Sequence, residues 1–335
     1  MKTSQRPSQP TPDPQPQLVP PGDRIEAITR LLPPGAQRSD ADRFQAFAAE
    51  NSIPLDWLWS LPTPSGRHRT CVLAVPSPGR TAMLFSSKLD KGERIDPLAR
   101  VLRHCLDFLT SQKIELAQSL LQPTDTIGYT AFESAGFQDL AVLQYMEVPV
   151  PRRARPPALP DGLELVPYDE SMRAELAVVL DASYEDTLDC PGLRGLRQTD
   201  DVITGHQATG HYDPSLWTLA RHDGAPVGVV LINRSTQGRQ AELVYIGVAS
   251  TARGRGWGRL LIEHGLFLAS QAKMPYVSLA VDMGNQPAVQ LYNSLGFVAT
   301  SQRRAVIRST RCLQESHVEG GCPPAHPGQV DNACG

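Results

Sequence analysis

Arginine and glycine alternate from Arg253 to Arg259, and residues of these types in this order suit an anion. The run follows a strand-like apolar segment, 241–248, and opens a helix-like segment that ends near Lys273. Glycines at a helix start let a ligand approach the first-turn N–H groups, whose unpaired donors and positive dipole favour phosphate oxygens. The guanidinium groups, including that of Arg255, add positive charge. The turn therefore predicts an anion site, best suited to a phosphorylated cofactor.

Two other phosphate-binding motifs do not fit this turn. A Walker A loop needs Lys and then Ser or Thr after its second glycine, whereas Gly258 is followed by Arg259 and Leu260. A dinucleotide-binding turn reads G-x-G-x-x-G and stands early in its domain, whereas this turn reads G-x-G-x-G and comes late in the chain. A helix-start loop without a ligand remains open as an alternative for the turn alone.

Two further motifs flank the turn. Glu242 lies in the strand-like segment before it, and the pattern Asn285-x-x-Ala288-x-x-x-Tyr292-x-x-x-Gly296-Phe297 follows it. Taken in order, the three motifs resemble the GNAT superfamily of acyl-CoA-dependent N-acyltransferases, over residues 163–308 or thereabouts. The resemblance implies that the turn holds the pyrophosphate of acetyl-CoA and that the preceding strand splays from its neighbour to pair with pantetheine. The cofactor-binding residues that it implies are Ile246, Gly247, Val248, Arg253, Gly254, Arg255, Gly256, Trp257, Gly258, Arg259 and Asn285.

The same resemblance implies roles in proton transfer. An amine attacks a thioester only when neutral, so a base must accept a proton, and an acid helps the CoA thiolate to leave. Tyr292 matches the family's acid, with a half-buried aromatic as the alternative interpretation. Glu242 matches a base that often acts through water, with an exposed strand carboxylate as the alternative. Asn285 also suits a helix cap, because Pro287 is tolerated in a first turn. Asp282, at a strand end, is expected to face the same cleft and to anchor a cationic acceptor.

A covalent mechanism is the alternative to direct attack. Cys190 stands near His206 and His211, residue types that a thiol triad uses. Their spacing is not diagnostic, and Pro191-Gly192 places the cysteine in a loop. Direct attack by the amine in a ternary complex is therefore favoured.

The second half reads as a mixed sheet with helices on both faces. Asp223-Gly224 predicts a hairpin, and the segments around the glycine turn predict a right-handed β-α-β unit. Ser171 is expected to cap the first helix. The expected strands are 163–166, 216–221, 226–233, 241–248 and 276–281, and the expected helices are 171–183, 200–209 and 258–273.

The first half repeats this pattern in faded form. Residues 160 positions apart correspond, as for Gly136-Phe137 with Gly296-Phe297, and a helix at 98–113 is followed by a strand at 114–121. The chemical residues are lost: the counterparts of Glu242, Arg253, Gly256, Gly258 and Tyr292 are Ala82, Glu93, Asp96, Leu98 and Phe132. Acidic residues would repel a pyrophosphate there. The coincidence of two unrelated α/β domains is the alternative to a degenerate copy.

The sequence thus predicts an α/β protein of two tandem GNAT-like domains. The expected divisions are a disordered tail at 1–22, a degenerate domain at 24–150, a Pro/Arg linker at 151–161, a catalytic domain at 162–309 and a disordered tail at 310–335. One acetyl-CoA is expected per chain, in the second half. A fragment covering 158–311 is expected to keep measurable CoA binding.

Composition narrows the class of protein. The 335 residues carry a net charge of −3, so nucleic acid is not an expected partner. No apolar run of about 18 residues is present, and a cytoplasmic protein without membrane contact is expected. The six cysteines lack paired spacing. The tail set Cys312, His317, Cys322, His326 and Cys334 matches no closed zinc module, so no metal is expected.

Two classes of function remain. The first is an N-acetyltransferase that uses acetyl-CoA to modify a small-molecule or peptide amine, including, in a narrower version, an aminothiol conjugate. The second is a non-catalytic acyl-CoA-binding or scaffold protein. Glu242 and Tyr292 beside an intact glycine turn favour the first, because a binding module needs only the turn. The oligomeric state stays open.

Overall fold

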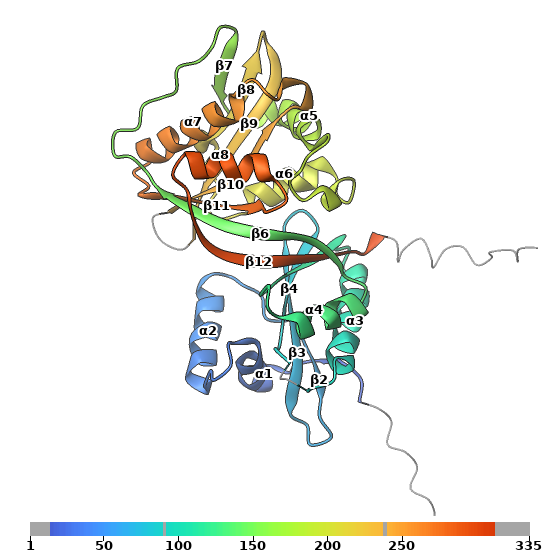
Figure 1. The fold of residues 1–335 in the computed structure, drawn as a ribbon. Helices are drawn as coiled ribbons and strands as arrows, with labels where there is room; N and C mark the ends of the chain where they lie inside the picture. Colours follow the sequence, from blue (N-terminus) through green and yellow to red (C-terminus); the bar gives the residue numbers. More distant parts are fainter. Residues whose placement is uncertain (1–13, 90–91, 237–239, 312–335) are drawn as a thin grey trace, which may run out of the picture.

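The computed structural model describes residues 14–89, 92–236 and 240–311 (Figure 1). The Cys/His set of the C-terminal tail lies outside these residues. The first half contains β1 (Gln17–Leu18), α1 (Arg24–Leu31), α2 (Arg38–Glu50), β2 (Leu58–Pro62), β3 (His68–Ser77), β4 (Thr81–Ser86), α3 (Asp96–Ser111), β5 (Leu116–Leu121), α4 (Thr126–Ser134) and β6 (Gln138–Pro149). The second half contains β7 (Leu163–Pro167), α5 (Arg173–Tyr184), α6 (Thr199–Gln207), β8 (Trp217–His222), β9 (Ala225–Arg234), β10 (Gln240–Val248), α7 (Trp257–Gln271), β11 (Tyr276–Asp282), α8 (Gln286–Ser294) and β12 (Val298–Ser309).

The described strands form one sheet, in the order β1-β2-β3-β4-β5-β12-β6-β11-β10-β9-β8-β7. From one edge the order is β1 to β5 followed by β12, and from the other edge it is β7 to β11 followed by β6. Each half therefore ends in the last strand of the other half. Figure 1 shows β6 and β12 side by side between the two halves. The two cross-pairings also share a register, because Gln118 pairs with Ile307 as Ser278 pairs with Glu147, at positions 160 residues apart. The halves are therefore repeats that have exchanged their final strands.

Backbone details support the repeat at the same spacing. Lys113 and Lys273 lie just after α3 and α7 with φ of 60° and 58°, and Gly136 and Gly296 lie just after α4 and α8 with φ of 88° and 86°. The predicted fold class, mixed α/β in two tandem units, is confirmed. One equivalence shifts: β4 begins its pairing with β5 at Thr81↔Leu116, and β10 begins its pairing with β11 at Gln240↔Tyr276. The register thus makes Met83, not Ala82, the counterpart of Glu242, and the position remains apolar.

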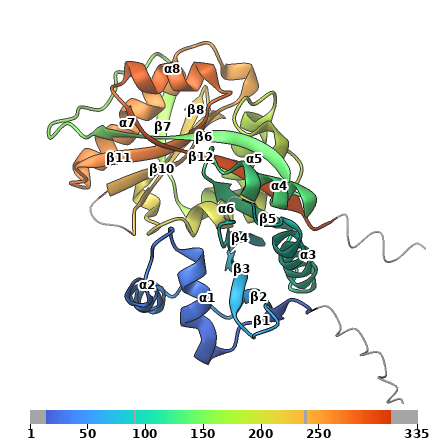
Figure 2. The ribbon, with the colours of Figure 1, turned by 60° about the horizontal axis from the view of Figure 1, so that its bottom comes forward.

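Helices cover both faces of the sheet in each half. In the second half, Val230 and Ile232 of β9 pack with Leu261 and Ile262 of α7 in one core. Val229 and Leu231 face the other way, into a core with α5. The first half is built alike: Figure 2 shows α1 and α2 on one side of the strands and α3 on the other. The predicted strands and helices of the second half are confirmed, and β10 and β11 are parallel as expected.

The cap expected at Ser171 is wrong, and the bounds expected for the two tails, 1–22 and 310–335, include a few structured residues at their inner ends. The cap near the start of α5 is Asp169, whose side chain accepts from the Ser171 N–H before a short 3-10 helix, Glu170–Met172. The N-terminal segment is ordered from β1 onward, since Leu18 pairs with Trp59 and Val19 is buried. At the other end, Thr310 is also buried.

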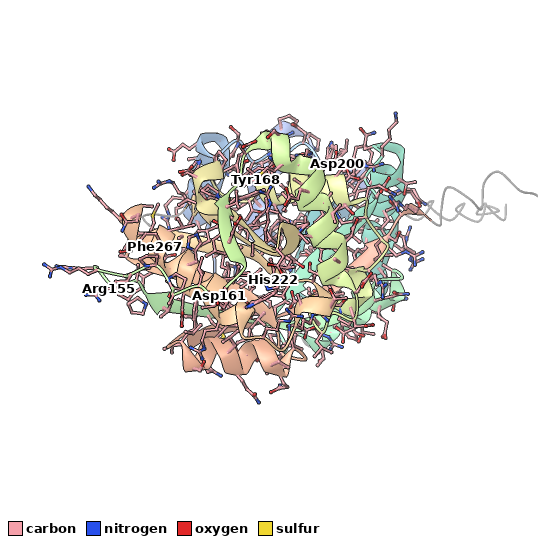
Figure 3. All side chains as sticks on the ribbon, turned by 90° about the horizontal axis from the view of Figure 1, so that it is seen from above. Arg155, Asp161, Tyr168, Asp200, His222 and Phe267 are labelled. Atoms are coloured by element: carbon pink, nitrogen blue, oxygen red, sulfur yellow. The ribbon has the colours of Figure 1, made fainter. Side chains whose placement is uncertain are left out.

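The basic linker is exposed, and Arg155 points away from the protein body in Figure 3. Among the described residues, no helix is long and apolar enough to cross a bilayer.

The strand exchange changes the expected behaviour of the fragment 158–311. Without the first half, β11 loses β6, its antiparallel partner from Tyr276 to Asp282, and β12 loses both of its neighbours. We therefore expect this fragment alone to lose CoA binding, and we expect the two halves, co-expressed as 14–150 and 158–311, to copurify and regain it. Size-exclusion chromatography with calorimetry tests this. A monomeric fragment that binds CoA as tightly as the full chain would contradict it.

Candidate active site

A cavity lies in a fork between β10 and β11. The two strands pair only at Gln240↔Tyr276, Ala241↔Val277 and Glu242↔Ser278. Beyond this point β10 remains paired with β9, and β11 with β6. A cavity of about 310 Å³ lies in the fork, lined by residues 243–248, 279–281, the start of α8 and the loop that follows α5. The edge of β10 beyond Glu242 thus has backbone groups available to an extended ligand.

One wall of the fork depends on a glycine. A Cβ on Gly247 would lie 2.7 Å from Ser183 Oγ and 2.8 Å from a ring carbon of Tyr245. Ser183 also donates to or accepts from the Tyr245 hydroxyl at 2.7 Å. Only glycine lets α5 approach β10 this closely, because a side chain at position 247 would overlap Ser183 and Tyr245. Gly247 therefore shapes the fork.

The glycine turn presents an open helix start to the fork. Gly254 and Gly256 have φ of 81° and 79°, and a Cβ on either would meet nothing within 4 Å. Gly256 is the residue before α7 and Gly258 lies in its first turn, where N–H groups have no partner within the helix. Gly258 also lines the cavity. The backbone therefore fits the phosphate site that the sequence predicts.

Arg253 holds the turn against the rest of the half. Its guanidinium donates to the carbonyls of Ser183, Glu185, Asp186 and Val248 at 2.7–3.3 Å. A guanidinium has five N–H donors, so most of them are used within the protein. The side chain therefore fixes the loop after α5 to the glycine turn, a role that the sequence did not indicate.

The other residues of the motif divide between core and surface. Trp257 is buried, with its ring 5.0 Å from that of His222 and with the Arg255 guanidinium 5.1 Å from its centroid. Its side chain belongs to the core, so only its backbone can serve a phosphate. Arg259 donates to Ser294 Oγ at 2.6 Å. Asn285 caps α8 by accepting from the Ala288 N–H and also lines the cavity, so the predicted cap is confirmed.

The two predicted proton-transfer residues occupy different places. Tyr292 on α8 is buried and lines the cavity, and burial, together with the charge of Asp189 and the nearby Tyr245, raises its pKa. Its hydroxyl thus stays protonated at neutral pH. Glu242 lies at the closed end of the fork, half-buried and outside the cavity lining. Burial raises the pKa of its carboxyl, which makes it a stronger base when ionised.

Asp282 does not take the predicted place in the cleft. It is 7% exposed, and its carboxylate accepts from the N–H groups of Cys190 at 3.1 Å and Gly284 at 2.8 Å. These bonds tie the end of β11 to the loop after α5. Asp189 on that loop lines the cavity instead. Sequence reasoning missed Asp189 because its placement depends on contacts between distant segments.

The thiol triad does not assemble. Burial and the carboxylates of Asp189 and Asp282 raise the pKa of Cys190 to about 12, which keeps it a thiol. His206 stacks on Tyr245 with ring centroids 5.4 Å apart, and burial lowers its pKa to about 4. His211 pairs with Arg234 through backbone atoms at a separate β-bridge. Within the described part of the chain, no group of three His, Cys, Asp or Glu is placed to hold a metal.

Comparisons with known proteins agree with the fold and the fork. Residues 180–297 match the family model described as Acetyltransferase (GNAT) family. A crystal structure of a GCN5-related N-acetyltransferase from Sphaerobacter thermophilus superimposes with a TM-score of 0.59 at 14% identity, covering 90% of this chain and 96% of that one, which shows the fold. Most of the second half is therefore similar to an acetyltransferase domain of the GNAT family, in agreement with its motifs.

The sequence likeness is narrower. The mycothiol acetyltransferase of Thermomonospora curvata is 36% identical over 101 residues, which are 30% of this chain and 33% of that protein. That of Streptomyces griseus is 30% identical over 150 residues, which are 44% of this chain and 47% of that protein. The matches thus span a third to a half of these relatives. A half that lacks the chemical residues, followed by a half that keeps them, is an arrangement that resembles mycothiol synthase, and these matches agree with that likeness.

The open conformation of Gly256 gives a testable prediction. Gly256→Asp places a carboxylate at the helix start, and we expect CoA affinity to fall by at least about tenfold, or ~1.4 kcal/mol. Gly66, in the β2–β3 hairpin, has the same φ of 79° and equally open surroundings. Gly66→Asp should therefore cost similar stability, about 1 kcal/mol, without changing CoA affinity. Calorimetry and thermal melts measure both. Equal CoA affinity in the two folded variants would remove the turn from the cofactor site.

Proposed function

We propose that this protein is an N-acetyltransferase that transfers the acetyl group of acetyl-CoA to an amine acceptor by direct attack in a ternary complex. The observation that carries the proposal is the cavity in the fork, which joins the open helix start of α7 to the buried hydroxyl of Tyr292. A protein that only binds acyl-CoA needs the helix start but has no use for a phenol there. This favours the enzyme over the scaffold interpretation.

The residues present fit acetyl-CoA, the co-substrate that supplies a thioester carbonyl for an amine to attack. In this proposal the first-turn N–H groups of α7, at Gly256 to Gly258, bind the pyrophosphate. The free edge of β10, at Ile246, Gly247 and Val248, pairs with the pantetheine amides. Arg255 and Arg259 add charge at the entrance. Asn285 contacts the cofactor from the start of α8, where it lines the cavity.

Two side chains move protons in this proposal. Tyr292 holds its proton at neutral pH and donates it to the departing sulfur. Glu242 stands outside the cavity, so it accepts the amine proton through an intervening water. The likeness to mycothiol acetyltransferases makes an aminothiol conjugate the first acceptor to test in a thiol-release assay, followed by small amines and peptide N-termini.

Tyr292→Phe keeps the ring and removes the acid. We expect kcat to fall by about 100-fold while the Kd for acetyl-CoA stays unchanged, because only the departing sulfur needs the proton. Tyr276→Phe is the matched control, since Tyr276 is exposed at the start of β11 and outside the cavity lining. Steady-state thiol release measures both variants. Wild-type kcat in Tyr292→Phe, with an acceptor that the wild type uses, would exclude the acid role.

Glu242→Gln tests the base through the pH profile. The base acts only when ionised, so wild-type kcat/KM should fall as the pH drops through the raised pKa of Glu242. In Glu242→Gln this acid limb should disappear, and the rate should drop about 100-fold above the raised pKa, with a smaller loss below it, where the wild-type carboxyl is protonated as well. Glu164→Gln, an exposed change on β7, serves as the control. An unchanged acid limb in Glu242→Gln would assign the base to another group.

A further inference from the structure

Asp189 is a carboxylate in the cavity that the proposed proton transfer does not use. It lies on the loop after α5, lines the cavity beside Tyr292 and Tyr245, and is reached by solvent. Its charge acts on both phenols. Tyr292 and Tyr245 come from α8 and β10, so three separate elements converge around this carboxylate.

The position of Asp189 is fixed by reciprocal hydrogen bonds. Its Oδ1 accepts from the Asp282 N–H at 3.1 Å, and Asp282 Oδ2 accepts from the Cys190 N–H at 3.1 Å. Arg253 holds the carbonyls at the start of the same loop. The second carboxylate oxygen of Asp189 accepts no hydrogen bond within the described residues. A carboxylate that is fixed at one oxygen and available at the other is arranged to receive a donor.

The surroundings of Asp189 favour a cation. Within the described residues no arginine, lysine or histidine forms an ion pair with it, and Arg253 uses its donors on carbonyls. The rings of Tyr184 and Tyr245 stand edge to face with centroids 5.6 Å apart, and both line the cavity. Tyrosine faces attract cations, and Asp189 presents a carboxylate oxygen to the cavity that has no ion-pair partner among the described residues.

We propose that Asp189 is the binding site for the acceptor's ammonium group. This inference rests on the proposed function and deepens it, because it states the class of acceptor: a primary amine that enters the cavity in its charged form. Asp189 orients the nitrogen toward the fork, and the aromatic walls take a compact apolar substituent. An acceptor with an anionic group next to its nitrogen is disfavoured by the carboxylates of Asp186 and Asp189, which both line this cavity.

The test uses a pair of probes in the presence of CoA, so no transfer takes place. The probes are n-butylammonium and 1-butanol, which share their length and a terminal donor and differ in charge. We expect the wild type loaded with CoA to bind n-butylammonium about tenfold more tightly than 1-butanol, by NMR titration. Asp189→Asn should lose this advantage and keep its CoA affinity. Asp107→Asn, an exposed change on α3, should keep both.

The outcomes separate the two proposals. Equal binding of the probes by the wild type, or an advantage that survives in Asp189→Asn, overturns the ammonium site whether or not acetyl transfer is found. Absent transfer with intact charge selectivity overturns the proposed function alone. If Asp189→Asn does not fold, the wild type at falling pH gives the same test, because protonation removes the charge of Asp189. Burial raises the pKa of Asp189, so as the pH falls n-butylammonium binding should be lost at a higher pH than for an ordinary aspartate. The other titratable or charged groups around Asp189 are Asp186, Asp282, Cys190, Tyr245, Tyr292 and Arg253.

Discussion

The pairing of β11 with β6 is the interaction on which the rest of the site depends. A strand that leaves its neighbour exposes backbone donors and acceptors, and buried ones are costly without partners. β11 can turn away from β10 after Ser278 because β6 satisfies its other edge as far as Asp282. The fork in the second half is therefore held open by a strand from the first half. The first half lacks the chemical residues, yet the cavity could not exist in this form without it.

Arg253 and Asp282 show how the open fork is stabilised locally. One guanidinium gathers carbonyls from the end of α5, the following loop and β10, and one carboxylate joins the far side of that loop to β11. Hydrogen bonds to charged groups contribute more than neutral ones, typically about 1.5–3 kcal/mol each. Both charged side chains form their hydrogen bonds with backbone groups. Asp189, in contrast, lines the cavity and has no ion-pair partner among the described residues.

The sequence revealed what local rules control. Glycine at positive φ, proline in a first helical turn and apolar periodicity act over a few residues. The glycine turn, the cap at Asn285 and the repeat could therefore be predicted from the sequence. The exchange of β6 and β12 could not, because either strand could pair in its own half with the same apolar pattern. The sequence placed Asp282 in the cleft and gave no sign of Asp189 for a similar reason. Both are acidic residues near the fork, and only the fold of the distant loop determines which of them faces the cavity.

The exchanged strands also constrain how the chain is made. β5 ends at Leu121 and its outer partner, β12, ends at Ser309, so the ribosome must add nearly the whole second half before β5 is covered. At a typical synthesis rate of about 5–20 residues per second, this takes on the order of ten seconds or more. During that time an unpaired edge strand is open to wrong partners, including another nascent chain. The polypeptide is thus vulnerable for more than half of its synthesis up to β12, and this last strand of the described residues ends the exposure.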